Sequence, residues 1–173
     1  GNILITGTYA GSVDMFWVPI TSSGGMHDIF LAKLTSTGST LWVKSAWGTS
    51  DNDSWNAVKV SNNGDIYVGG YFSTSADIFW QFLTSSGGQD IFLAKLSSTG
   101  NTQWVKKYGG SDVDNLTSIW VDDSSDSVVV TGNFQWTNID IFWQLLSSSG
   151  SFWPFTYADL YVAKLTSTGN TQW

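Results

Sequence analysis

The stretch DIFLAKLSSTGNTQW, residues 90–104, is written three times in the chain. An earlier copy, DIFLAKLTSTGSTLW, begins at Asp28, and a later one, DLYVAKLTSTGNTQW, begins at Asp159. The three starting positions are therefore 62 and 69 residues apart. Self-similarity at a long, nearly fixed spacing is typical of solenoids, propellers and other repeat arrays.

Each copy is expected to form a β-hairpin. DIFLAKL is a short apolar run rich in β-formers, and it is too short for a typical helix. The Ser, Thr and Gly residues that follow are turn chemistry, because Gly adopts positive φ at no steric cost. Residues 41–44 and 103–106 then read as return strands, and two β-runs joined by a short Gly-containing loop predict a hairpin.

A full repeat is expected to hold four strands. In the middle repeat these strands are expected at residues 57–60, at 66–72, from 90 onward and at 103–108, with a long connection over 73–89. The second strand also recurs, and its Gly7, Gly70 and Gly132 are 63 and 62 residues apart. A regular glycine inside a strand indicates a bulge or a close backbone approach.

This alignment divides the chain into units at residues 1–55, 56–116 and 117–173. The first unit lacks its first strand, and the last stops where its fourth strand begins. The ends are either arbitrary boundaries or the limits of the visible part of a longer protein. We favour the longer protein, because a deliberately chosen domain boundary normally respects the repeat.

Composition narrows the class of protein. Hydrophobic residues make up 42% of the chain, which is enough for a packed core. Only 12% of residues are charged and the net charge is −7, so a phosphate-binding surface of clustered Lys and Arg is not expected, nor is nucleic acid as a partner. No apolar run approaches the roughly 20 residues of a membrane-spanning helix. With no cysteine, disulfides and thiolate metal sites are excluded.

The order of these elements resembles the SBBP β-propeller repeat, a family found mostly in large secreted or surface proteins of bacteria. The matching text is VKVSNNGDIYVGGYF, then SADIFW, then QDIFLAKLSSTGNTQW, then YGGSDVDN. The chain departs from the family where DIFW stands in place of the usual Asp-Phe-Pro. The resemblance implies four-stranded antiparallel blades and an extracellular or cell-surface location, and it implies no catalytic residues.

The need to bury apolar surface also predicts an all-β chain of propeller blades. A four-stranded blade has two apolar faces, and stacking blades around an axis covers both of them. The alternative is a β-solenoid, whose coils are typically shorter than this repeat. Because fewer than three complete blades cannot close a ring, we expect the remainder of a longer chain, or other copies, to pack against the open faces. Copies that associate head to tail without closing would form a filament.

The best binding candidates are Trp17, Trp80 and Trp143, which are 63 residues apart. Two interpretations stay open: the indoles pack between the long connection and the blade beneath, which the repeated role favours, or they form flat platforms for glycans or protein partners. An apolar insertion, SFWPFTY, occurs in the last repeat only. Its Phe152, Trp153 and Phe155 are expected to mark a contact site.

Paired aspartates occupy matching loops between the repeats: Asp51, Asp53, Asp112 and Asp114. Carboxylates two residues apart can ligate Ca²⁺, but they also hydrogen-bond their own turns. We favour the turn role and expect no cofactor, because the distal Glu of a full Ca²⁺ loop is absent.

No catalytic set is visible. His27 is the only histidine and is expected in a solvated loop, so no second histidine exists to serve as a base. Asp28, Asp90 and Asp159 each precede a Lys by five residues, an odd separation that puts the two side chains on opposite faces of a strand. The expected function is a non-enzymatic structural or adhesive module, and the alternative is a glycan-binding propeller.

Overall fold

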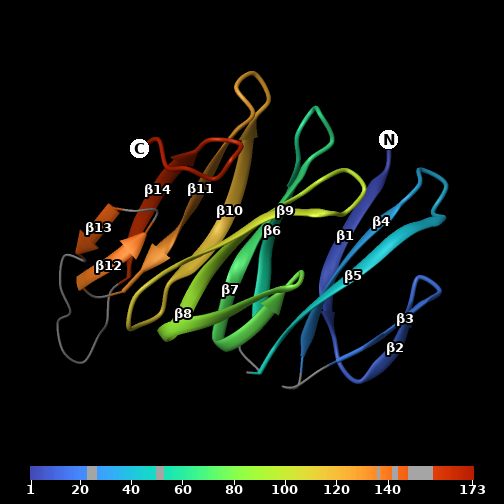
Figure 1. The fold of residues 1–173 in the computed structure, drawn as a ribbon, viewed down its shortest axis with the longest axis horizontal. Coiled ribbons are helices and arrows are strands. Elements are labelled where there is room, and N and C mark those ends of the chain that lie inside the picture. Colours follow the sequence, from blue (N-terminus) through green and yellow to red (C-terminus); the bar gives the residue numbers. More distant parts are fainter. Residues whose placement is uncertain (23–26, 50–52, 136, 142–143, 148–157) are drawn as a thin grey trace.

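The computed structural model describes residues 1–22, 27–49, 53–135, 137–141, 144–147 and 158–173. Strands account for 69% of the described residues, and no helix occurs among them. The all-β expectation is therefore confirmed. The sheets lie side by side from the N-terminal to the C-terminal end of the chain (Figure 1).

Three groups of antiparallel strands, called the first, middle and last sheets below, follow one another along the chain. A short pairing of residues 47–48 with residues 76–77 joins the first two into one seven-stranded sheet. The first sheet contains β1 (Ile3–Tyr9), β4 (Asp28–Leu34) and β5 (Thr40–Gly48). The middle sheet contains β6 (Ser54–Val60), β7 (Ile66–Ile78), β8 (Gln81–Leu96) and β9 (Thr102–Tyr108), paired in that order. The last sheet contains β10 (Asn115–Asp122), β11 (Ser127–Phe134) and β14 (Asp159–Leu165). The four strands expected in the middle repeat are confirmed, with boundaries extended by up to several residues.

The long connection of each repeat is itself a hairpin, which the sequence did not predict. We call these hairpins arms: the first arm pairs β2 (Ser12–Met15) with β3 (Val18–Thr21), and the last pairs β12 (Thr137–Ile141) with β13 (Gln144–Ser147). In the middle arm β7 and β8 run on beyond the sheet, so that residues 75–78 pair with 81–84. The long connection expected over 73–89 is therefore mostly strand.

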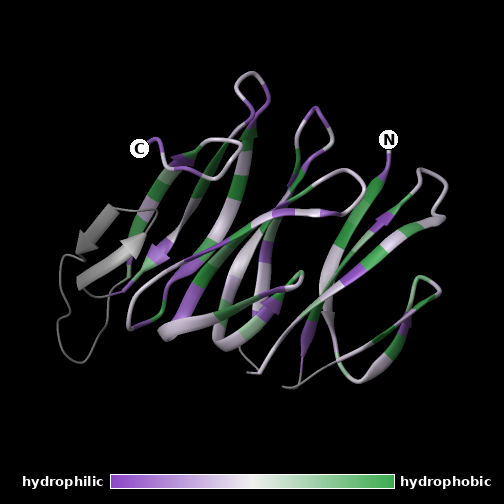
Figure 2. Cartoon of the chain, viewed as in Figure 1, coloured by the Kyte–Doolittle hydropathy of each residue, from purple (hydrophilic) through white to green (hydrophobic). Residues whose placement is uncertain are grey.

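The middle sheet is buried on both faces. Phe92, Ala94 and Leu96 of β8 pack toward the first sheet, while Ile91 and Leu93 pack toward the last. Side chains alternate between the two faces of a strand, so burial of both faces requires a nearly unbroken apolar run. Bands of hydrophobic residues accordingly cross the strands of all three sheets (Figure 2).

Close backbone approach explains the strand glycines. A Cβ at Gly70 would overlap the carbonyl oxygen of Ser54, and one at Gly132 would overlap that of Asn115. In both places the pairing register also shifts, in β6 after Trp55 and in β10 after Leu116. The expected bulge and close approach are thus both confirmed.

The turns that follow β8 and β14 dock on the preceding repeat. Gly100, at φ +85°, lies where a Cβ would be 3.0 Å from the ring of Trp42 and 2.8 Å from Lys44 Cε. Gly169 meets Trp104 and Lys106 in the same way, and the Trp104 indole donates a hydrogen bond of 3.0 Å to the Ser167 carbonyl. The recurring Gly and Trp of the repeat are therefore two halves of one contact between neighbouring repeats.

Replacing Gly100 by Ala should destabilise the chain more than replacing Gly38. Both glycines have positive φ, +85° and +88°, so both variants bear the cost of left-handed backbone, about 1 kcal/mol. A Cβ at Gly38 meets no atom within 4 Å, whereas one at Gly100 crowds Trp42, which adds roughly 1–2 kcal/mol. Urea denaturation of Gly38→Ala and Gly100→Ala measures the difference, and equal losses would contradict the proposed contact.

Candidate functional site

The tips of the first and middle arms are two-residue turns made of aromatic residues. Phe16 and Trp17 have φ of 52° and 67°, and Phe79 and Trp80 have φ of 54° and 73°. Two-residue hairpin turns with positive φ at both positions normally use Asn-Gly or Gly-Gly. Bulky residues held in this region cost of order 1–3 kcal/mol each. Both arms therefore carry backbone strain at their tips.

One aromatic residue of the middle turn is anchored in the core. Phe79 is 3% exposed, and its ring meets that of Trp55 edge to face with centroids 5.0 Å apart. Thr102 Oγ1 donates to the Phe79 carbonyl at 3.2 Å, and Thr40 Oγ1 makes the matching bond of 2.7 Å to Phe16. These contacts fix the turn and explain why Phe, despite its strain, occupies the first position.

The second residue of each turn points into solvent. Trp17 is 95% exposed and Trp80 is 89% exposed. The backbone N–H of Trp80 donates to Asp77 Oδ1 at 2.6 Å, which holds the turn beneath an indole that has little contact with the rest of the chain. The packing interpretation is therefore wrong for Trp17 and Trp80. Trp143, Phe152, Trp153 and Phe155 lie outside the described residues.

A groove lies beside each exposed indole. The first, of about 470 Å³, is lined by Trp17 and Trp42 and by the segment Thr37–Thr40. The second, of about 240 Å³, is lined by Trp80, by Val18–Ile20 of the first arm and by Val43–Ser45 of β5. Val18 lines both grooves, so the two adjoin. The tip of the middle arm thus borders a surface made by the first arm and the first sheet.

Two carboxyl groups meet in the interior of the loop between the middle and last sheets. Asp90 and Asp114 are both fully buried, and a Cβ on Gly109 would lie 2.7 Å from an oxygen of Asp90 and 2.9 Å from one of Asp114. Asp114 accepts a 2.7 Å hydrogen bond from the Gly110 N–H, and Asp90 accepts one of 2.8 Å from the Ser86 N–H. The turn role expected for Asp114 is confirmed.

Burial raises the pKa of Asp114 in this pair. Desolvation, reinforced by the negative charges of Asp90 and Asp112, raises the pKa of Asp114 to about 6, although hydrogen bonds from the Gly110 and Gln135 N–H groups oppose the shift. Lys107 Nζ forms an ion pair of 3.0 Å with Asp90 and compensates one of the two charges. The sequence did not predict the pairing of Asp90 with Asp114, because the two residues lie 24 positions apart.

The other described aspartates of these loops also accept hydrogen bonds, from a distant strand residue at Asp53 and from the neighbouring residue at Asp112. Asp53 Oδ1 accepts from the Ser73 N–H at 2.8 Å, and Asp112 accepts from Ser111 Oγ at 3.0 Å. Asp51 lies outside the described residues. Within the described part of the chain, no group of three or more His, Cys, Asp or Glu side chains could hold a metal ion.

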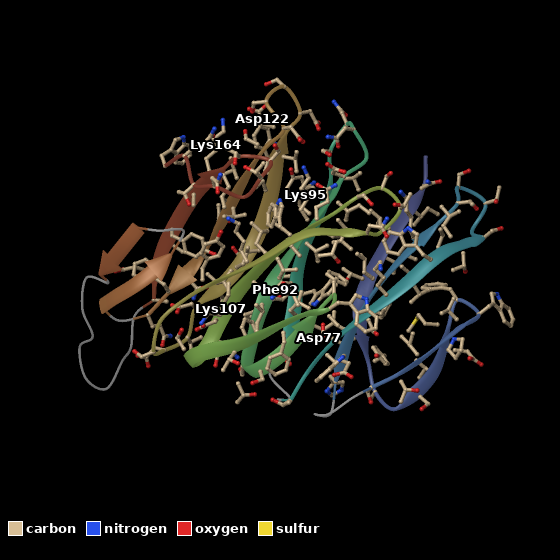
Figure 3. All side chains as sticks on the ribbon, in the orientation of Figure 1. Asp77, Phe92, Lys95, Lys107, Asp122 and Lys164 are labelled. Carbon is tan, nitrogen blue, oxygen red and sulfur yellow. The ribbon has the colours of Figure 1, made fainter. Side chains whose placement is uncertain are left out.

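The Asp and Lys of the repeated motif pair with other partners, as their odd spacing predicts. Lys95 Nζ lies 2.9 Å from Asp65 Oδ2 and 3.5 Å from Asp126 Oδ2, which belongs to the last sheet. Figure 3 places Lys95 and Lys107 toward opposite ends of the middle sheet. Lys95 therefore joins two repeats, while Lys107 serves the buried Asp90. His27 is exposed immediately before β4, as expected.

Comparisons with known proteins leave the geometry of the structure as the main guide to function. No protein-family model matches the chain, and no curated protein matches it either. Among the described residues, no helix is long and apolar enough to cross a membrane.

Acidification should stabilise the chain through Asp114. Its folded-state pKa of about 6 exceeds the ordinary value near 3.9, so this group's contribution is fully present below about pH 4 and is lost as the pH rises through 6. The contribution amounts to roughly 2–3 kcal/mol. Denaturation of wild type and Asp114→Asn between pH 4 and 7.5 measures the free energy of unfolding. The loss of stability as the pH rises through 6 should appear in wild type only. Asp14→Asn, at an exposed position, is the control; a component that survives in Asp114→Asn would contradict the assignment.

Metal should have little effect on stability. A cation bound only by the folded chain would raise the melting temperature by mass action. We expect thermal melts in EDTA and in added Ca²⁺ to coincide. A large gain with Ca²⁺ would overturn the turn role given to Asp53, Asp112 and Asp114.

Proposed function

We propose that the three sheets are adjoining blades of an open β-propeller array that serves as a non-enzymatic structural or adhesive module of a large bacterial surface or secreted protein. The resemblance to the SBBP repeat supports the blade and its extracellular setting. The observation that carries the proposal is the unequal burial of equivalent residues on successive sheets.

Each sheet presents two different faces to its neighbours. On the face directed toward the C-terminal neighbour, Ile29 of the first sheet is 2% exposed and Ile91 of the middle sheet is 0% exposed. The equivalent Leu160 of the last sheet is 84% exposed. The following position repeats the pattern, because Leu93 is 0% exposed and its equivalent Val162 is 57% exposed. The face directed toward the C-terminal neighbour is thus buried in the first and middle sheets and exposed to solvent in the last.

The proposed occupant of this face is another repeat of the same kind. The opposite face of the middle sheet, with Phe92 and Ala94, already covers Ile29 and Leu31 within the chain. An added repeat would present an equivalent face to Leu160 and Val162. Another copy of the chain or the remainder of a longer protein would supply that repeat. Exposed apolar patches of this kind typically mark protein–protein contacts.

The two faces of a sheet differ, so the contact between copies is heterologous. A heterologous contact gives a ring if its rotation closes and a filament if it does not. The free edge of β1 favours the same association. One edge of β1 pairs with β4, and no other described strand pairs with it. An extracellular filament is therefore part of the proposal, and negative-stain electron microscopy of concentrated samples tests it.

Placing a charge on the exposed face should weaken association of the 173-residue chain. Burying a Leu side chain contributes about 1.5–3 kcal/mol, so Leu160→Asp should weaken self-association at least tenfold. Sedimentation velocity over a range of concentrations measures the change. Val60→Asp is the matched control, because Val60 is 46% exposed but lies in the middle sheet, whose two faces are already covered. A wild-type chain that stays monomeric at every concentration would overturn the proposal.

A further inference from the structure

We propose that the exposed indoles of the arms and the adjoining grooves beside them bind a linear, neutral polysaccharide. This inference goes beyond the structural role and does not depend on it. It starts from the two strained turns, which place an indole in solvent at the same point of successive repeats.

Stability alone does not explain a tryptophan at these positions. Phe79 offsets its strain by burial, but Trp80 is 89% exposed and gains little contact. A glycine would adopt φ of 67° or 73° without strain. The strained choice nevertheless occurs in both described turns, at Trp17 and Trp80. Strain retained without a packing benefit indicates a contact made outside the chain.

Hydrogen bonds and a buried ring fix the backbone that carries the indoles. The Trp80 N–H bond to Asp77, the Thr102 bond to the Phe79 carbonyl and the buried Phe79 ring fix the middle tip. The Thr40 bond to Phe16 fixes the first. A binding group that is already ordered loses little conformational entropy when a ligand arrives. The tips are therefore preorganised platforms.

The chemistry of the grooves fits a sugar. A pyranose ring has a face of C–H bonds, which stacks on an indole, and an edge of hydroxyl groups, which needs donors and acceptors. The first groove offers Trp17 and Trp42 beside the hydroxyls of Thr37, Ser39 and Thr40. The second offers Trp80 beside Ser45 and Lys44.

Charge and shape narrow the ligand further. Lys44 is the single charged residue that lines either groove, and the chain has a net charge of −7, so a polyanion is disfavoured. The two grooves adjoin at Val18, with Trp17 lining one and Trp80 lining the other. Two adjoining grooves, each with an indole on its wall, suit an extended polymer that spans both of them.

The test uses the 173-residue chain and defined glycans. Pull-down with cellulose, chitin, β-1,3-glucan and mannan identifies the polymer, with alginate as the anionic control, and titration calorimetry with the matching hexasaccharide gives the affinity. We expect binding to at least one neutral polymer. Trp17→Gly/Trp80→Gly should weaken it at least tenfold, whereas Trp120→Ala, which removes an exposed indole from the last sheet, should leave it unchanged.

The same variants separate binding from packing. Because glycine relieves the strained turns, Trp17→Gly/Trp80→Gly should have a higher melting temperature than wild type while it loses the polysaccharide. A lower melting temperature would assign the indoles to packing and overturn the proposal. Equal binding of alginate, binding to none of the four polymers, or loss of self-association in place of glycan binding would also overturn it.

Discussion

Burial of the third strand on both faces is the constraint on which the rest of this structure depends. In β4 and β8 every residue of the DIFLAKL segment is buried. One parity of side chains faces the next repeat, and the other faces the preceding repeat in β8 and the first arm in β4. In β14, where the outer face is bare, Leu160 and Val162 are exposed while Tyr161 and Ala163 stay buried. The same motif therefore produces two burial patterns, and the presence of a neighbour decides between them.

Two-sided burial also governs the polar residues of the motif. An ionised group in such a strand needs a partner, because desolvation of an unpaired charge is costly. Lys95, 3% exposed, reaches Asp65 and Asp126 and lies 5.1 Å from the centre of the Tyr67 ring. Burial alone would lower its pKa, but hydrogen bonds to Asp65 and Tyr67 outweigh that effect and raise it. Lys95 thus joins the middle and last sheets.

The local elements were predictable, and the contacts between distant segments were not. Apolar runs, turn glycines and the spacing of Gly70 and Gly132 carry their information within a few residues, so the strands and bulges followed from sequence. The arms did not, because Phe-Trp is a poor turn signal and gives no hint of positive φ. Exposure of Trp80 was also missed, since equal spacing suits packing as well as binding. Only the fold shows that its indole has little to pack against.

Glycine and tryptophan occupy left-handed backbone in this chain for opposite reasons. At Gly100 the turn is pressed against Trp42, so both the positive φ and the lack of space require a glycine. At Trp80 the backbone has the same hand, but the side chain projects into solvent and the large residue fits without overlap. Contact between repeats accounts for the first choice. The second choice lowers stability and is balanced by no internal contact of comparable size, so it is best explained by something the indole meets outside the fold.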